Sequence, residues 1–311
     1  SPALALTDHG VMYGAIDFYK KATEEGIKPI IGCEIYMSAE DHREKKRHDA
    51  FHLTVWAKDL EGYQNLMKLV SIAQIDGFYY RPRIDMQLLA KHAKGLMAST
   101  GCPAGLVGRR LINESYESAL NTAKEFSQVF GTGNFYVELQ RHPWQKFAEA
   151  QGVPAKVREE LKERAKESVK LEEGLIKISR DLGLPIIATN DVHYIEKEDA
   201  VAQDAIVCIQ TGKVIADTER MRYVDTPDYY LKTPEEMVES FLDFPEAIEN
   251  TVKLADKVDL EIKLGEWYFP EFELPKDKTA GEVLREMAYS GAKEKFGEVT
   301  KEISERLDYE L

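Results

Sequence analysis

The distribution of hydrophobic positions predicts a regular alternation of strands and helices over the first 190 or so residues. Short apolar runs, typical of strands buried on both faces, alternate with segments whose apolar residues recur three and four positions apart, as in amphipathic helices. We expect strands at residues 3–7, 28–37, 51–57, 95–100, 134–140 and 184–189. This alternation predicts an α/β fold with parallel strands and right-handed crossovers, and six such units favour a barrel over an open sheet.

The intervening patterns predict helices at about residues 11–25, 60–70, 116–130 and 156–182, with Gly26 and Gly183 ending the first and last. Residues 77–83 read as an aromatic and basic loop, and Asp85 begins a short helix after it.

The pattern changes after residue 193. We expect a helix at 197–209, a strand at 229–232, and helices from Thr233 to about 242 and from 245 to 258. An extended connector then leads to a helix at 280–296, capped by Thr279. We divide the chain into a barrel domain with a helical extension, residues 1–265, and a connector with the beginning of a second domain, residues 266–311. The latter segment is too short to close a core, which predicts a truncated domain.

The net charge of −14 argues against nonspecific nucleic-acid binding by the whole surface, but it leaves room for a local basic groove and suits a protein that holds divalent cations. Cys33, Cys102 and Cys208 show no paired spacing, which indicates a reducing, cytoplasmic setting. The sequence shows neither a membrane-spanning segment nor a signal peptide. Because Ser1 and Pro2 lead straight into a strand, we expect the chain to begin inside a domain.

Polar residues gather at the ends of the predicted strands. Because the carboxyl ends of barrel strands meet at one face, we expect them to converge there. A set of imidazole, carboxylate and thiolate suits two or three Zn²⁺, Mn²⁺ or Fe²⁺ ions, and clustered ions hydrolyse phosphoesters by generating hydroxide and clamping the attacking and leaving oxygens. The set comprises Asp8, His9, Glu34, His52, Cys102, Glu138, His142, Asp191 and His193.

Each of these residues has a simpler interpretation. Asp8 can cap the helix that follows, His52 can be a satisfied core histidine, and Cys102 can be an inert buried thiol. Glu34 lies in an apolar run where an unpaired carboxylate is costly, which favours a ligand. His52 begins its strand rather than ending it, so we expect that strand to enter from the loop side.

Several dispersed motifs together resemble the PHP (polymerase and histidinol phosphatase) domain, most closely the version found in α subunits of bacterial DNA polymerase III. The resemblance covers essentially the whole chain, and the tail from about Trp267 is similar to the start of that polymerase's palm region. The motifs are Thr7-Asp8-His9-Gly10, Gly32-Cys33-Glu34, Phe51-His52-Leu53-Thr54, Gly77-Phe78-Tyr79-Tyr80-Arg81-Pro82-Arg83, Thr100-Gly101-Cys102-Pro103, Glu138-Leu139-Gln140-Arg141-His142, Thr189-Asn190-Asp191-Val192-His193 and Tyr230-Leu231-Lys232-Thr233-Pro234-Glu235-Glu236-Met237.

The resemblance implies a distorted (β/α)₇ TIM-like barrel, here lacking its first strand, with a site for up to three Zn²⁺ or Mn²⁺ ions. The family's N-terminal His-x-His and a following Asp have no counterpart in this sequence, so we expect fewer than three ions and weak binding. Asp191, His193 and His9 are the expected catalytic residues. The family's metal ligands that map here are His9, Glu34, His52, Cys102, Asp191 and His193.

For the parent protein the resemblance implies a DNA-directed DNA polymerase that uses Mg²⁺, with a palm beyond Leu311, and a barrel that proofreads single-stranded 3′ ends. The alternatives are a stand-alone phosphatase and a non-catalytic scaffold for a proofreading exonuclease. Expected partners are DNA, a sliding clamp or an exonuclease subunit, and no membrane. Arg141 and His142 can orient a phosphate or form a structural ion pair. The residues expected to hold a frayed strand are Tyr79, Tyr80, Arg81 and Arg83.

Overall fold

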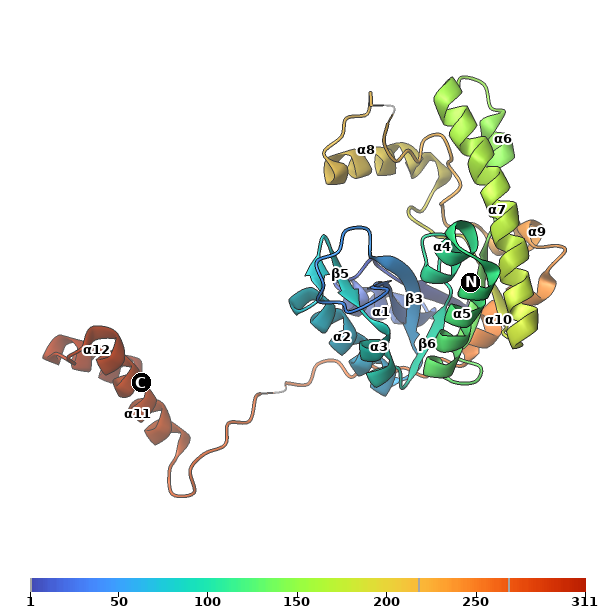
Figure 1. Ribbon diagram of the computed structural model, residues 1–311. Coiled ribbons are helices and arrows are strands. Elements are labelled where there is room, and N and C mark those ends of the chain that lie inside the picture. Colours follow the sequence, from blue (N-terminus) through green and yellow to red (C-terminus); the bar gives the residue numbers. More distant parts are fainter. Residues whose placement is uncertain (1, 218, 268) are drawn as a thin grey trace. The chain divides into compact units, whose positions relative to one another are not determined.

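The computed structural model describes residues 2–217, 219–267 and 269–311 (Figure 1). They form two compact units, Ser1–Ile262 and Lys263–Leu311. The strands found in the described residues all belong to the first unit, where a curled sheet is surrounded by helices. This arrangement confirms the expected α/β, TIM-like architecture.

The sheet is organised around one long strand, β2 (Lys28–Met37). It pairs in parallel with β1 (Ala3–Leu6) along its first half and with β5 (Arg81–Ile84) near its end. Strand β1 (Ala3–Leu6) lies off the main path. Along that path the order is β4 (Phe78–Tyr79), β5 (Arg81–Ile84), β2 (Lys28–Met37), β3 (Phe51–Ala57), β6 (Leu96–Ser99), β7 (Phe135–Gln140) and β8 (Ile186–Thr189).

Strand β3 runs antiparallel to both of its neighbours, β2 and β6, so the expectation of a uniformly parallel sheet is wrong at this position. The reason is local: residues 38–50 form a loop without a crossover helix, and a direct return of the chain produces an antiparallel pair. The reversal places His52, near the start of β3, opposite Tyr36, near the end of β2. The prediction that this strand enters from the loop side is therefore confirmed.

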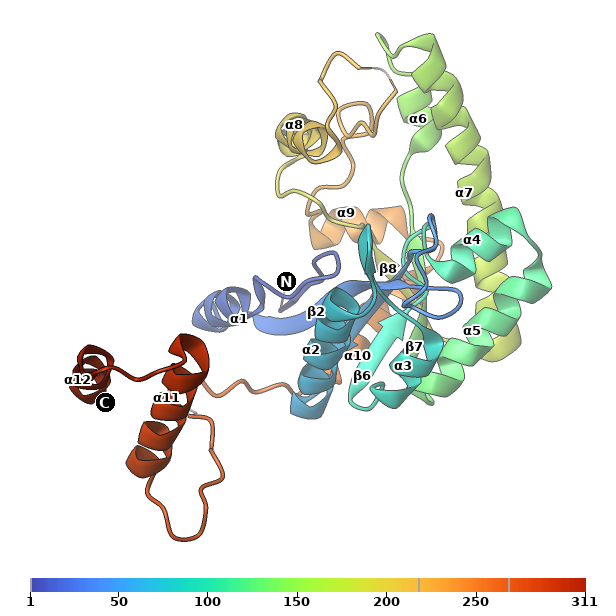
Figure 2. The same ribbon diagram turned by 60° about the vertical axis from the view of Figure 1, so that its left-hand side comes forward.

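Helices cover the sheet: α1 packs on β2, α2 on β3 and β5, α5 on β6 and β7, and α10 on β8. Figure 2 shows α2 and α3 beside the strands, and both ribbon views place α8 apart from the sheet. None of the helices in the described ranges is both long and apolar enough to cross a bilayer. The helices of the first unit are α1 (Ala15–Glu24), α2 (Leu60–Ile75), α3 (Met86–Lys91), α4 (Leu106–Asn113), α5 (Tyr116–Phe130), α6 (Trp144–Ala148), α7 (Ala155–Leu182), the 3₁₀ turn η1 (Lys197–Asp199), α8 (Ala200–Thr211), α9 (Pro234–Ser240) and α10 (Pro245–Asp256).

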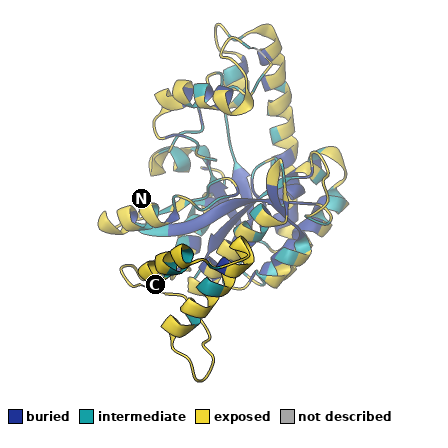
Figure 3. Ribbon diagram, turned by 90° about the vertical axis from the view of Figure 1, so that its left-hand side faces the viewer, coloured by how far each residue is buried: buried dark blue, intermediate teal, exposed yellow. Residues whose placement is uncertain are grey.

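The main core lies between the sheet and the helices that cover it. Figure 3 shows the strands as mostly buried and the outer helical faces as exposed. Leu66 and Leu69 of α2 and Phe126 of α5 are almost fully buried in this core, as the helical spacing predicts. Asp59 and Ser115 cap these two helices by accepting hydrogen bonds from the backbone N–H groups of Gly62 and Ser118.

Two expected elements differ from the structure. The segment expected as a loop at 77–83 contains the short hairpin β4–β5, and the strand expected at 229–232 is reduced to a single bridge between Tyr230 and Tyr194. Two backbone hydrogen bonds, from His193 N–H to the Tyr229 carbonyl and from Leu231 N–H to the Tyr194 carbonyl, also hold this segment. The Asn190 amide adds to them by donating to the carbonyl oxygens of Asp228 and Tyr230 at 2.7 and 2.9 Å.

The second unit contains α11 (Ala280–Phe296) and α12 (Lys301–Glu310). Thr279 and Glu282 form the capping box that begins α11. The two helices are joined through Tyr289, which lies 2.9 Å from the Ser304 hydroxyl and donates to the Asp308 carboxylate at 2.6 Å. Two paired helices do not make a domain core, so the assignment of residues 266–311 to the start of a palm region stays a prediction.

Candidate metal centre

His9 lies shortly after the end of strand β1 and is fixed by a backbone bridge to Glu34 of β2. The Gly10 N–H donates to the Glu34 carbonyl at 2.9 Å, and the Glu34 N–H donates to the Asp8 carbonyl at 3.0 Å. Gly10 has a φ of +66°, and a Cβ there would lie 2.7 Å from Cγ of Pro82. The tight turn after His9 therefore requires glycine, and it brings the β4–β5 hairpin against the site.

Glu34 is the centre of the site. Its side chain is 8% exposed, and Oε1 lies 2.6 Å from Nδ1 of His9 and 2.9 Å from Nδ1 of His52. Burial alone would raise the pKa of Glu34, but the two imidazole hydrogen bonds outweigh it and lower the pKa to about 2. The bond to Glu34 in turn raises the pKa of His9. The expected cost of burying this carboxylate is thus offset by the two histidines.

Cys102 completes the half of the site that β3 and β6 provide. Its Sγ lies 3.2 Å from Nδ1 of His52, and one ligand atom from each of Glu34, His52 and Cys102 fits within a 4.8 Å cluster. Burial holds the pKa of the Cys102 thiol well above its usual range. A bound cation reverses that preference by stabilising the thiolate, so this thiol is suited to a metal and not to a free nucleophile.

Asp191 and His193 lie just after β8. Asp191 adopts a φ of +49°, an unusual conformation for a residue other than glycine. His193 lies with its ring centroid 5.6 Å from that of His9, and its Nδ1 is 2.6 Å from the Asp191 carbonyl oxygen. Burial raises the pKa of Asp191, and the negative charge of Glu34 raises it further. The two carboxylates therefore share a region of negative potential that a cation would relieve.

An aromatic wall closes the His193 side of the site and was missed in the sequence. The rings of Tyr223 and Tyr229 lie 5.2 and 5.6 Å from that of His193, and 5.2 Å from each other. Both tyrosines come from the segment between α8 and α9. No periodic pattern links that segment to β8, and its place depends on long-range contacts, such as the hydrogen bond from the His193 N–H to the Tyr229 carbonyl.

Glu138 and Asp8 do not join this cluster. Glu138 is buried and accepts hydrogen bonds from Ser99, Thr189 and Gln140, while burial raises its pKa. Asp8 contributes its backbone carbonyl, which accepts from the Cys33 thiol at 3.2 Å. Both residues support strand ends without presenting a free carboxylate to the cluster.

The residues expected to contact nucleic acid have different surroundings. Tyr80 is 62% exposed and Arg81 is exposed, whereas Arg83 is 1% exposed and lies beneath a loop, out of reach of a nucleic acid. Arg141 is ion-paired with Glu172 on α7 at 2.5 Å and also with Asp243. These contacts give Arg83 and Arg141 structural roles.

His142 Nδ1 lies 2.8 Å from the Asp228 carboxylate, which also accepts from Lys232. Its ring packs on Tyr229 with centroids 4.4 Å apart. Its Nε2 is buried without a hydrogen-bond partner in the described residues. His142 thus lies behind the aromatic wall.

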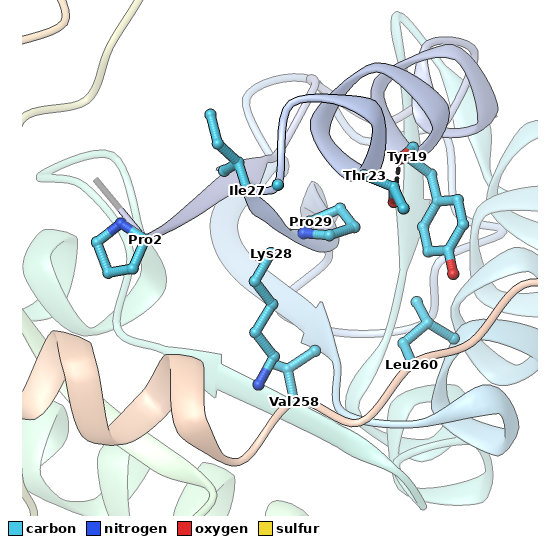
Figure 4. Close-up of a pocket in the computed structure, with 9 residues that line it drawn as sticks. Pro2, Tyr19, Thr23, Ile27, Lys28, Pro29, Val258 and Leu260 are labelled. Atoms are coloured by element: carbon cyan, nitrogen blue, oxygen red, sulfur yellow. Dashed lines mark hydrogen bonds between the residues drawn. The ribbon is translucent and has the colours of Figure 1, made fainter.

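Two other features of the first unit lie outside this cluster. Asp41, His42 and Asp85 form a second group with metal-ligating atoms, but Arg43 holds Asp41, and Asp85 caps α3 through the Leu88 N–H. A hollow of about 360 Å³ opens at the other end of β1 and β2 (Figure 4). It is lined by Pro2, Tyr19, Thr23, Gly26, Ile27, Lys28, Pro29, Val258 and Leu260.

The curled sheet and the histidines, carboxylates and thiol at its strand ends form a TIM-like α/β fold with a candidate metal site. Residues 1–142 match the PHP domain family, so the chain contains a PHP domain and the resemblance seen in its motifs is confirmed. The matched part includes His9, Glu34, His52 and Cys102.

Relatives extend the similarity along the whole chain. The chain is 42% identical to the DNA polymerase III subunit alpha of Borreliella burgdorferi over 314 aligned positions, which cover 99% of this chain and 25% of the relative. It is 38% identical to that of Treponema pallidum, with the same coverage, and 38% identical to that of Thermus aquaticus, over 93% of this chain and 23% of the relative. The chain spans about a quarter of the length of these relatives.

Proposed function

We propose that this chain is part of a replicative DNA polymerase and that its PHP domain is a metal-dependent phosphodiesterase acting on single-stranded 3′ ends. The observation that supports the proposal is the grouping of nitrogen, oxygen and sulfur donors around the Glu34 carboxylate, from His9, His52 and Cys102, with the His193 ring next to that of His9. Such a mixed set suits Zn²⁺ or Mn²⁺ better than Mg²⁺, which prefers oxygen alone.

The geometry of the cluster fits this proposal. His9 and His52 each direct Nδ1 at one buried carboxylate, and Cys102 adds a soft donor next to His52. We assign His9, Glu34, His52, Cys102, Asp191 and His193 as the residues that would hold the ions. When bound, such ions supply a hydroxide nucleophile at neutral pH and stabilise the charge that develops on phosphate oxygens.

The protein groups around the cluster have positioning and shielding roles. Asn190 fixes the segment that carries Tyr229, and the aromatic wall excludes water from one side of His193. We further propose, from the likeness to the α subunits, that the whole polypeptide is a cytoplasmic DNA-directed DNA polymerase that uses Mg²⁺. Its partners would be DNA and other replicase subunits, such as a sliding clamp or a proofreading exonuclease.

The test compares His193→Ala with the matched control His92→Ala, which removes a histidine at the end of α3, outside the cluster. Bound Zn²⁺ and Mn²⁺ are measured by mass spectrometry after equilibrium dialysis, and hydrolysis is followed on a 3′-labelled single strand. We expect His193→Ala to lose metal and at least about 100-fold in hydrolysis, the order of magnitude lost when groups that support a metal are removed. Equal metal content and equal hydrolysis in both variants would refute the proposal.

A further inference from the structure

The β2–β3 loop and the β4–β5 hairpin meet beside the metal centre, and Arg83 joins them. Although Arg83 belongs to β5, its guanidinium donates to the carbonyl oxygens of Glu44 at 2.6 Å and His42 at 3.2 Å. Nε donates to the Gly77 carbonyl at 3.3 Å. One buried arginine therefore holds residues 42–46 in a defined path against the hairpin.

Five exposed cations lie on these two segments, and two of them are paired with carboxylates. Arg43 is paired with Asp41, and Lys46 lies 3.4 Å from Glu40. By contrast, Lys45, Arg47 and Arg81 form no ion pair with any carboxylate in the described part of the chain. Unpaired cations gathered on a chain of net charge −14 indicate a surface for an anion.

An exposed aromatic ring lies among these cations. Tyr80 has a φ of +60°, and its hydroxyl accepts a hydrogen bond from Arg47 at 2.8 Å, with the guanidinium 5.2 Å from the ring centre. The ring of Tyr79 packs edge-on against it at 4.7 Å. The hairpin thus keeps a large apolar ring in solvent, in a strained backbone conformation, instead of burying it.

Residues next to Tyr80 in the hairpin contact residues of the metal centre. The Arg81 guanidinium lies 5.8 Å from the Tyr36 ring, which packs edge-on against His52 with centroids 5.2 Å apart. Pro82 contacts the turn at Gly10 that follows His9. A chain of contacts through Tyr36 therefore links Arg81 of the hairpin to His52 of the cluster around Glu34.

We propose that Lys45, Arg47, Tyr80 and Arg81 form a track that binds the backbone and one base of a single-stranded nucleic acid and directs its end to the metal centre. The inference rests on the proposed function for its destination, while the track itself is defined by its own contacts. Cations alternating with a stacking ring are what single-strand binding requires, since phosphates take the charges and a base takes the ring. An acidic peptide would use the charges but would gain nothing from Tyr80.

The test measures binding of a fluorescein-labelled dT₁₂ by anisotropy in EDTA, so that metal and hydrolysis play no part. We expect Lys45→Gln/Arg47→Gln to weaken binding at least about fivefold at low salt. Because two phosphate contacts are lost, the plot of the logarithm of the association constant against the logarithm of salt concentration should become less steep by about 1.4. Tyr80→Leu should weaken binding by about fivefold or more without changing that slope. The matched control is Lys124→Gln/Arg180→Gln, an exposed pair on α5 and α7.

Binding by the track variants that equals that of the wild-type chain would overturn the inference, as would a poly-glutamate peptide that competes as well as dT₁₂. The binding assay and the hydrolysis assay distinguish failure of the track from failure of the proposed function. If dT₁₂ binding depends on Lys45, Arg47 and Tyr80 but no metal-dependent hydrolysis occurs, the track stands and the phosphodiesterase proposal falls. If hydrolysis depends on His193 but dT₁₂ binding does not depend on Lys45, Arg47 and Tyr80, the phosphodiesterase proposal stands and the track is refuted.

Discussion

Replacement of Arg83 by Met should cost the first unit about 3–5 kcal/mol of folding free energy. The variant keeps most of the side-chain volume but removes every donor. It leaves the close carbonyl acceptors of His42, Glu44 and Gly77 without their partner, and it leaves the buried Asp49 carboxylate without the guanidinium 3.8 Å away. Each unpaired buried acceptor costs about 1 kcal/mol or more of folding free energy. The total loss stays near the stated range because the loop can relax and expose some of these acceptors to water.

Thermal unfolding followed by circular dichroism checks this prediction. For a unit of this size, a loss of 3–5 kcal/mol corresponds to a fall in Tm of roughly 10 °C. The matched control is Arg81→Met in the same hairpin, whose exposed guanidinium contributes only a contact with the Tyr36 ring, worth about 1 kcal/mol or less. A Tm for Arg83→Met equal to that of Arg81→Met would refute the role of Arg83 in holding the loop.

Two further predictions concern the metal centre and the segment behind it. Cys102→Ala should lower bound Zn²⁺ more than bound Mn²⁺ in equilibrium dialysis, because a thiolate favours the softer ion, and an equal loss of both would argue against sulfur ligation. Burial would raise the pKa of Asp204, but hydrogen bonds from Arg220 and the Tyr223 N–H lower it. Asp204→Asn should therefore destabilise the chain at pH 7, and in urea unfolding the difference should shrink as the pH falls below about 4, the ordinary pKa of Asp. A difference independent of pH would contradict this assignment.

Most of the sheet and the long helices could be predicted from the sequence, because strand burial and helical spacing are local patterns. Helix α7 ends at Leu182 as expected, since Gly183 takes the left-handed conformation that stops it, and α11 begins after Thr279 as its capping box indicates. The hairpin at residues 78–84 was not predicted. It has only two residues in its first strand, and Tyr80, with positive φ, does not have the residue type that normally marks such a turn.

The sequence indicated which residues could form the metal centre but not how they pair. Glu34 was favoured as a ligand because an unpaired carboxylate is costly in an apolar run, and the structure supplies the two imidazoles that meet this requirement. The contributions of Tyr223 and Tyr229 depend on long-range contacts, from Asp204 to the Tyr223 N–H and from His193 to the Tyr229 carbonyl, and no local pattern encodes these. The different surroundings of Arg81 and Arg83 were equally hidden. The two arginines are two positions apart in β5, so strand alternation alone does not distinguish them, and Arg83 is buried because residues 42–46 of the β2–β3 loop cover it.

The reversed direction of β3 links the fold to the site. In a uniformly parallel arrangement His52, near the start of its strand, would lie at the end of the sheet opposite Glu34. Because the β2–β3 loop returns the chain directly, the start of β3 lies beside the end of β2, and His52 reaches Glu34 and Cys102. The same loop carries Lys45 and Arg47, so the connection that completes the metal centre also supplies the cations beside it. A change in the length of this loop should therefore affect metal affinity and single-strand binding together, whereas the track substitutions should affect only the second.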